Sequence, residues 1–529
     1  MKAFLTKYSP CLLSLLLGVS AFLFWYFRYP QALAYQEQLQ LFLFDGEYLA
    51  DRMSAPGGIA RYLAEFLVQF DNNLAAGSII LALLYVLLQV LTWLLMRREN
   101  GSRSWYSLSF LPSLMLWFYM GDENVKLTYV VALLLAMVAA VAYPYRRSPL
   151  FRSLYLLIVL PLLHWVAGPV VLMLGLYATW QEALRHQHYP LSLFSALFSV
   201  ASILLCAPFV PYPLYRLFYG INYNLVIPEI SLMQCFIMAV CVLLPLLMHF
   251  LPDLEGKKAR TVATVSTATL ALAGIFGIPS AFNDATYDIL RYDLLVRSQQ
   301  WDKIVAIAEK KQPDLPRSVA SLNLALGMRG ELNNRGMQFY QNGWQGAFPS
   351  FNKNFESSIV TAEIYYQLGL VNTAQRLDFE AMEAIPDNNK SARLVKRLAE
   401  TNLINGQYAV ARKYLKILQK TLFYKKWAEQ TLPLLGDEDA INQHPTYGRM
   451  RQLRLTRDFL FSEQELDKIM GQLVMQNKDN YLAIQYLLFL PVLEGDQQKL
   501  MMYRDFVQRV MQPQEPNPNP DEGGETHEQ

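Results

Sequence analysis

The chain has little charge and few cysteines for its length of 529 residues. Charged residues make up 17% of it, against about 25% in ordinary soluble domains. The formal net charge is +2, so no overall field favours nucleic acid as a partner. The four cysteines lie in apolar segments and form no C-x-x-C pair: Cys11, Cys206, Cys235 and Cys241. A disulfide framework or a structural zinc site is therefore not expected.

Familiar catalytic motifs are lacking as well. The chain contains no H-E-x-x-H, no G-x-S-x-G, no P-loop, and no G-x-G-x-x-G in a dinucleotide-binding context. His186 and His188 stand close together, but two histidines alone make a poor metal site. The motifs in the sequence therefore do not indicate which reaction, if any, the protein catalyses.

Long apolar runs are abundant and stop near Phe282. A helix needs about 20 largely apolar residues to cross a bilayer. Such runs predict membrane-spanning helices at these positions: 10–28, 74–96, 105–120, 125–144, 191–210, 230–250 and 261–281. A further segment, 151–180, is long for one crossing and is interrupted by Gly168-Pro169, so it is either one tilted span or a pair of short ones.

Basic residues favour the paired interpretation of 151–180, because cytoplasmic loops collect Lys and Arg. On this rule four basic regions belong inside: Lys2 with Lys7, 97–104, 145–152 and 257–260. Nine crossings satisfy all four. We therefore expect an all-α, polytopic protein of the bacterial inner membrane, with a cytoplasmic N-terminus and the chain after 282 outside the cytoplasm.

The loop between the first two expected spans, 28–73, has helical patterning. One helix is expected over 31–43, and a second, amphipathic helix over 59–70. The apolar side of the second comprises Ile59, Tyr62, Leu63, Phe66, Leu67 and Phe70, and its polar side Arg61, Glu65 and Gln69. A helix of this kind beside two spans is expected to lie in the membrane interface.

After 284 the pattern changes to amphipathic helices separated by short turns. Gly369 and Ala374 recur as Gly406 and Ala411, a period of 37 residues. Looser copies of the turn occur at 297–303, 326–332 and 494–496. These units resemble tetratricopeptide repeats, which stack into a concave surface for a peptide or protein. The alternative is an irregular helical bundle that only supports the membrane domain.

The expected organisation therefore has three parts. A transmembrane domain covers 1–281, a helical tetratricopeptide-like domain covers 282–511, and a tail covers 512–529. The tail is rich in proline and acidic residues, cannot bury a core and is expected to be disordered.

Acidic residues at the expected outer boundaries are the remaining chemical candidates: Asp45 and Glu47, then Asp122 and Glu123. A carboxylate there can take the proton of a sugar hydroxyl as the hydroxyl attacks. The layout of 1–280 resembles the lipid-linked-sugar glycosyltransferases of the C type, which have a large first outer loop with interfacial helices and an acid shortly after the first span. The resemblance implies that Asp45 is a base or metal ligand and that Asp122 or Glu123 is a second-loop acid. It also implies a polyprenyl-phosphate-linked sugar as substrate and a divalent metal as cofactor.

Other roles are open for these residues and their neighbours. Asp45-Gly46 is a turn, and Asp45 or Glu47 can cap a helix or pair with Arg52. His164 lies within an expected span, where an ionisable group is a functional candidate, or else a neutral histidine bonded to a carbonyl freed by Gly168-Pro169. The binding candidates are His164, Arg52 and Tyr62.

The whole chain also resembles a bacterial family of membrane proteins with this two-part layout and no assigned activity. The stretches that prompt this are 323–327, 366–369 and 397–402. We expect an envelope scaffold that recruits a protein partner, with a glycosyltransferase as the alternative. The hypothesis of a transporter has less support, because few of the expected spans contain the paired charges that ion coupling needs. A lipid-sized groove beside Asp45 favours the enzyme, and a solid bundle favours the scaffold.

Overall fold

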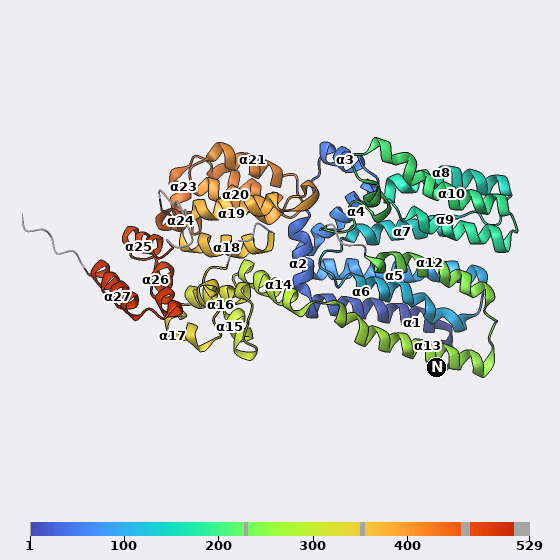
Figure 1. Cartoon of the computed structure of the whole chain (residues 1–529), viewed down its shortest axis with the longest axis horizontal. Coiled ribbons are helices and arrows are strands. Elements are labelled where there is room, and N and C mark those ends of the chain that lie inside the picture. The colour runs from blue at the N-terminus through green and yellow to red at the C-terminus, as the bar shows by residue number, and fades with distance from the viewer. Residues whose placement is uncertain (1, 227–230, 350–354, 456–465, 513–529) are drawn as a thin grey trace, which may run out of the picture. The chain divides into compact units, whose positions relative to one another are not determined.

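The computed structural model describes residues 2–226, 231–349, 355–455 and 466–512 and is built of helices throughout these ranges (Figure 1). No β-strand forms in them, and one isolated bridge joins Val125 to Asn224. The all-α prediction is confirmed for this part of the chain. Apart from Gln512, the expected tail lies outside the described residues.

The chain divides into two compact units that do not follow a single cut in the sequence. The first comprises Met1–Leu294, Ala381–Ala399 and Tyr408–Gly436, and the second comprises Leu295–Glu380, Glu400–Gln407 and Asp437–Gln529. Residues after 380 therefore belong partly to the same unit as the apolar N-terminal helices, which no local pattern in the sequence indicates.

The first unit is a helical bundle with loops at two ends (Figure 1). Its helices up to residue 297 are α1 (Lys2–Leu23), η1 (Phe24–Arg28), α2 (Pro30–Leu39), α3 (Gly46–Met53), α4 (Gly58–Val68), η2 (Gln69–Asn72), α5 (Leu74–Glu99), η3 (Arg103–Phe110), α6 (Leu111–Tyr119), α7 (Leu127–Ala142), α8 (Pro149–Ala167), α9 (Val171–Trp180), η4 (Gln181–Arg185), α10 (Tyr189–Cys206), η5 (Ala207–Phe209), α11 (Leu214–Tyr219), α12 (Leu232–Phe250), α13 (Gly256–Gly277), η6 (Ile278–Ala281) and α14 (Asp284–Arg297).

Six helical stretches in the described part of the chain are long and apolar enough to cross a membrane. They are Pro10–Arg28, Leu74–Glu99, Pro149–Ala167, Tyr189–Phe209, Leu232–Phe250 and Gly256–Ala281. The other predicted segments also form helices, but shorter ones: α6, α7 and α9. A polytopic membrane protein is compatible with this finding, and the count of nine crossings stays a prediction.

The loops with basic residues meet at one end of the bundle, which we call the basic end. Arg98 donates to the Ala140 carbonyl at 3.2 Å, and Arg185 pairs with Glu99 at 2.7 Å. The Asn100 side chain donates to the Leu251 carbonyl at 2.8 Å. These bonds gather the loops that follow α5, α7, α9 and α12, which is the arrangement that the nine-crossing prediction requires.

The segment 151–180 is two helices, α8 and α9, that pack on one another. They are joined at Gly168, whose φ of +87° few other residues adopt, and Pro169 follows it. The turn lies against the first loop, since the Gly57 N–H donates to the Trp165 carbonyl at 2.9 Å. We call this opposite end of the bundle the first-loop end.

A polar network crosses the apolar interior of the bundle. The Ser14 hydroxyl donates to Gln89 at 2.7 Å, and the Gln89 amide donates to Ser109 at 2.7 Å. These bonds link α1, α5 and η3, and hydrogen bonds between helices are a usual means of association where water is absent.

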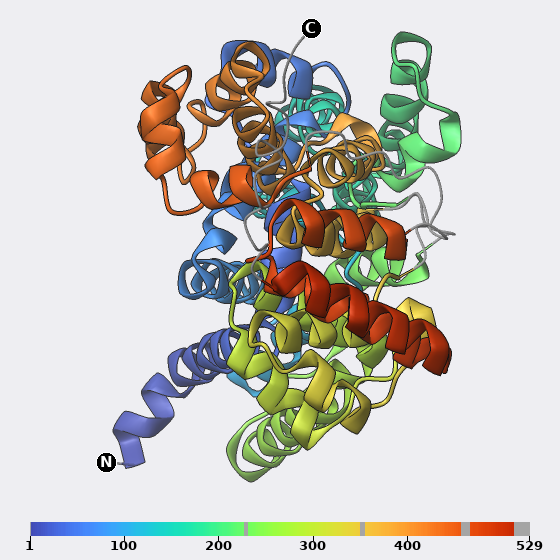
Figure 2. The same cartoon turned by 90° about the vertical axis from the view of Figure 1, so that its left-hand side faces the viewer.

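The remaining helices form helix–turn–helix pairs. They are α15 (Trp301–Lys310), α16 (Pro316–Met328), α17 (Leu332–Arg335), η7 (Gly336–Gln338), η8 (Gly343–Gly346), α18 (Phe355–Leu368), α19 (Val371–Glu383), η9 (Pro386–Asn388), α20 (Ala392–Ile404), α21 (Tyr408–Leu418), α22 (Lys425–Thr431), η10 (Leu432–Leu434), α23 (Glu438–Gln443), α24 (Tyr447–Leu453), α25 (Leu466–Gln476), α26 (Tyr481–Glu494) and α27 (Gln497–Met511). In the second unit α26 packs on both α25 and α27, the last helices of the chain, coloured red in Figure 2.

Five of the turns share one hydrogen-bond pattern. At Gly369 its own N–H donates to the Tyr366 carbonyl at 3.0 Å, and the next N–H donates to the Tyr365 carbonyl at 2.9 Å. The same two bonds, each with positive φ at the central residue, recur at Gln299, Gly330, Gly406 and Gly495. This is the Schellman cap, which favours glycine. The repeated positions noted in the sequence are thus equivalent turns, while strict tetratricopeptide geometry stays a prediction.

Candidate functional site

A buried ion triad lies at the first-loop end. The carboxylate of Glu65 in α4 accepts from Arg61 Nε at 2.8 Å and from Arg52 Nε at 2.7 Å. The Tyr48 hydroxyl also donates to Glu65. Burial alone would raise the pKa of Glu65, but the charges of Arg61 and Arg52 outweigh it and hold that pKa below its ordinary value. Glu65 is 1% exposed and is a carboxylate between two guanidinium groups.

The orientation of α4 is the reverse of that of an ordinary surface helix. The expected polar side, Arg61, Glu65 and Gln69, is buried, and the apolar side is half-buried or, at Leu63, exposed. An amphipathic helix with its apolar side outward suits a membrane interface. The triad supplies the partners that the buried charges need.

Arg61 also reaches the loop after α19. Its Nη2 donates to the Asn389 side-chain oxygen at 2.6 Å and to the Asp387 carbonyl at 3.4 Å. The Asp387 carboxylate in turn lies 3.5 Å from Arg216. A residue of the first loop is therefore bonded to a segment more than 300 positions later in the chain.

Lys126, immediately before α7, belongs to the same cluster. Its N–H donates to the Tyr223 carbonyl at 2.9 Å, and its side chain is 1% exposed. The charges that act on its ammonium group include Arg61, Glu65 and Asp387. Among the described residues, no acceptor lies within hydrogen-bonding distance of Lys126 Nζ.

Asp45, the acid implied by the glycosyltransferase resemblance, pairs with Lys420 and not with Arg52. The Lys420 Nζ donates to its carboxylate at 2.6 Å, and this hydrogen bond lowers the pKa of Asp45 below its ordinary value. The alternative pairing with Arg52 is wrong, because Arg52 is held by Glu65 and Asp51. Glu47 is exposed in the first turn of α3.

The pair at Asp45 is one of several contacts that attach residues after 380 to the first loop. The Phe44 N–H donates to the Lys420 carbonyl at 2.7 Å, and the Leu41 N–H donates to the Lys390 carbonyl at 2.8 Å. Further bonds join Tyr424 to Glu37 at 2.7 Å and Arg393 to Gln38 at 3.0 Å. Arg393 also pairs with Asp293 of α14 at 2.8 Å.

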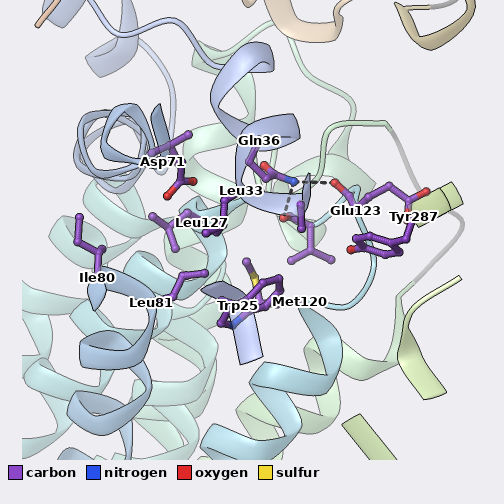
Figure 3. A pocket seen from close by; sticks show the side chains of 13 residues that line it. Trp25, Leu33, Gln36, Asp71, Ile80, Leu81, Met120, Glu123, Leu127 and Tyr287 are labelled. Atoms are coloured by element: carbon purple, nitrogen blue, oxygen red, sulfur yellow. Dashed lines mark hydrogen bonds between the residues drawn. The ribbon is translucent and has the colours of Figure 1, made fainter. Parts of the chain in front are cut away.

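Asp122 and Glu123 occupy the turn between α6 and α7. Asp122 is exposed and accepts from the Asn124 N–H at 2.9 Å, as in a turn stabilised by an acidic side chain. The Gln36 amide donates to the Glu123 carbonyl at 2.6 Å and to the Val125 carbonyl at 3.3 Å (Figure 3).

A cavity of about 30 Å³ lies beside this turn, lined by Glu123 and Gln36, with Asp71 among its walls (Figure 3). Burial, and next the charge of Glu37, raises the pKa of Asp71 well above its ordinary value. A volume of this size holds about one water molecule, so it is too small for a sugar or a lipid. Asp45 is not among the residues that line it.

A larger groove of about 480 Å³ runs along α1, α6 and α13 and is lined mainly by apolar side chains. Asp45 does not line this groove either. Neither of these two cavities is therefore the lipid-sized groove beside Asp45 that would favour the enzyme.

The other binding candidates are placed as follows. His164 in α8 is 2% exposed, and neither ring nitrogen has a partner among the described residues. The Tyr62 ring is half-buried and lies 5.0 Å from the Phe42 ring, as part of an aromatic cluster. In the described part of the chain, no group of three or more His, Cys, Asp or Glu side chains is arranged to hold a metal ion.

Sequence reasoning thus gathered Asp45, Arg52 and Tyr62 in the first loop but missed how Glu65, Arg61 and Lys126 combine. One signal was present, because Arg61 and Glu65 are spaced i, i+4 on one side of an apolar helix. Nothing local marked Lys126, since its surroundings come from three distant segments: the first loop, Tyr223 and Asp387.

The fold and this site define a class: an all-α protein that has, over the residues described, six helices long and apolar enough to cross a membrane and a buried, cation-rich cluster at one end of the bundle. The chain matches, over residues 5–520, a family of unknown function (DUF6057), and it belongs to that family. No curated protein and no solved structure matches it.

Proposed function

We propose that the chain is an envelope scaffold: a helical bundle in the inner membrane that holds a helical-repeat surface outside the cytoplasm for a protein or peptide partner. The observation that carries the proposal is the attachment of residues after 380 to the first loop. Asp45, Glu37 and Gln38 each bind a side chain from 393–424.

The physical argument concerns rigidity. A repeat stack joined to a membrane helix by one linker would swing freely, whereas ion pairs and backbone bonds at several points fix its nearest helices. Individually the exposed pairs contribute little, but together with backbone hydrogen bonds they define one geometry. A scaffold needs such a fixed base for the helices on which its partner-binding surface is built.

The alternative is a C-type-like glycosyltransferase acting on a polyprenyl-phosphate-linked sugar. The position of α2, α3 and α4 between α1 and α5 favours it. The pairing of Asp45 with Lys420 weighs against it, because a carboxylate with a lowered pKa is a poorer proton acceptor.

Complementation of a deletion strain separates the two. Chains with Asp122→Asn or Glu123→Gln should rescue the deletion strain fully if the protein is a scaffold, and Asp45→Asn should rescue it as well as Lys420→Met does, because both break the same pair. Loss of function in Asp122→Asn or Glu123→Gln, or in Asp45→Asn but not in Lys420→Met, with normal accumulation in the membrane, would overturn the scaffold proposal and support the enzyme.

A further inference from the structure

Buried charges at the two ends of the bundle are balanced differently. At the basic end Glu182 binds Arg152 at 2.7 Å, and Glu99 binds Arg185 at 2.7 Å. Within the cluster around Glu65 at the first-loop end, four cations face two carboxylates that are largely buried. The cations are Arg52, Arg61, Lys126 and Arg216, and the carboxylates are Glu65 and Asp387. Asp51 also pairs with Arg52, but its side chain is 70% exposed, so water screens it.

The cluster has more buried hydrogen-bond donors than acceptors, as well as more positive than negative charges. Lys126 Nζ is buried without an acceptor among the described residues, and so is the Nδ2 of Asn389. The Asn389 side-chain oxygen already accepts from Arg61, so its Nδ2 points away from that bond. A buried ammonium or amide without an acceptor is costly, which indicates that a further acceptor belongs here.

We propose that Lys126, Arg61 and Asn389 form a binding site for a phosphate group carried by a lipid headgroup or free in solution. A phosphate monoester carries about −1.5 to −2 charges at pH 7, which matches the excess of two positive charges. It also offers three oxygens that accept hydrogen bonds from ammonium, guanidinium and amide donors. A single carboxylate would leave one positive charge unbalanced.

A lipid source is favoured by the surroundings. The cluster is built on α4, whose apolar side is half-exposed and includes the exposed Leu63, and α4 packs on the apolar helices α7 and α8. The turn 386–389 covers the cluster with Asp387 in a left-handed conformation (φ +58°), so ligand exchange requires this turn to move. The inference is independent of the scaffold proposal.

The test uses the purified full chain in detergent and follows its thermal midpoint. The probes are inorganic phosphate, farnesyl phosphate and, as an uncharged control, farnesol. We expect farnesyl phosphate to raise the midpoint saturably, because a ligand that binds only the folded state stabilises it. In Lys126→Met the half-saturating concentration should rise at least tenfold. In Lys420→Met, which changes a lysine outside the cluster, the half-saturating concentration should equal that of the wild type.

Without ligand, Lys126→Met should melt at the wild-type temperature or above, since it removes an unbalanced buried charge. A purely structural lysine would give a lower midpoint instead. Asn389→Asp places a negatively charged side chain of nearly the same size as asparagine beside Arg61, so it should also weaken phosphate binding. This variant replaces Lys126→Met in the test if Lys126→Met does not accumulate.

The probes decide the source. A response to farnesyl phosphate at least tenfold stronger than to inorganic phosphate assigns a lipid headgroup, and equal responses assign a free anion. No response to either phosphate, an equal response to farnesol, or an unchanged response in both Lys126→Met and Asn389→Asp would overturn the site.

Discussion

The carboxylate of Asp45 lies 2.6 Å from the ammonium nitrogen of Lys420, 375 residues further along the chain. This contact bears on both the scaffold and the glycosyltransferase hypotheses. It attaches α21 and the loop after it to the first loop, and it pairs the carboxylate that the enzyme would need as a base with a lysine. It can be tested directly.

Asp45→Asn and Lys420→Met should each lower the thermal midpoint slightly and equally, and the double variant should equal either single one. The reason is that each substitution breaks the same exposed pair. Thermal unfolding of the purified chain provides the measurement. Additive losses would show that the two side chains act separately.

The same pair predicts a pH dependence. The folded-state pKa of Asp45 is lowered, so its contribution is present above the ordinary pKa of aspartate and is lost as the pH falls through the lowered value. The difference between wild type and Asp45→Asn should therefore vanish in acid and stay constant from about pH 5 to 8. A difference that grew towards low pH would contradict the assignment.

Glu65→Gln should be far more damaging, by about 3–5 kcal/mol in the free energy of unfolding, because it leaves two buried guanidinium groups without their carboxylate. Membrane accumulation and thermal midpoint both report the loss. Asp51→Asn is the matched control, since it removes only the exposed partner of Arg52 and should change little. If Glu65→Gln and Asp51→Asn lowered the stability equally, the Glu65 carboxylate would not be the buried partner of the two arginines.

Two glycine substitutions separate backbone strain from crowding. Gly495→Ala places a methyl group in open space at φ +72°, so it should cost about 1–2 kcal/mol from the left-handed backbone alone. Gly369→Ala adds a contact of 2.7 Å with the Leu453 carbonyl and should cost clearly more. Unfolding of the full chain is the measurement, because a 284–511 fragment would lack the first-unit partners of 381–399 and 408–436. Equal losses would place Gly369 away from that carbonyl.

The topology prediction is tested with single cysteines in a chain from which the four native cysteines are removed. A cysteine at Asp302 should react with a membrane-impermeant maleimide in intact cells, whereas cysteines at Arg146 and Lys257 should react only after permeabilisation. The first position lies in the second unit, and the other two are exposed at the basic end. The reverse pattern would place the helical repeats in the cytoplasm.

The sequence was most informative where the signal is local. Apolar runs located the helices, Gly168-Pro169 located the break between α8 and α9, and the recurring glycines located turns whose hydrogen bonds prove identical. Even the degenerate copy at 297–303 proved to be such a turn, with Gln299 taking the left-handed position.

Long-range pairing was not foreseeable in the same way. Asp45 had a nearby arginine, Arg52, as its obvious partner, and nothing local indicated Lys420. The two sides of α4 were predicted, but amphipathic patterning does not show which side of a helix the protein covers. Lys126 lacked any signal, because its significance depends on what surrounds it.

The composition of the first unit has a consequence for the order of synthesis. Residues 381–399 and 408–436 leave the ribosome after the last membrane helix and after much of the second unit. Until then Asp45, Glu37 and Arg61 lack Lys420, Tyr424 and Asn389. The helices of the bundle are thus synthesised first, but the first loop cannot complete its contacts until the later segments have been made. A nascent chain stopped before Asn389 would leave its first loop open to quality-control proteases.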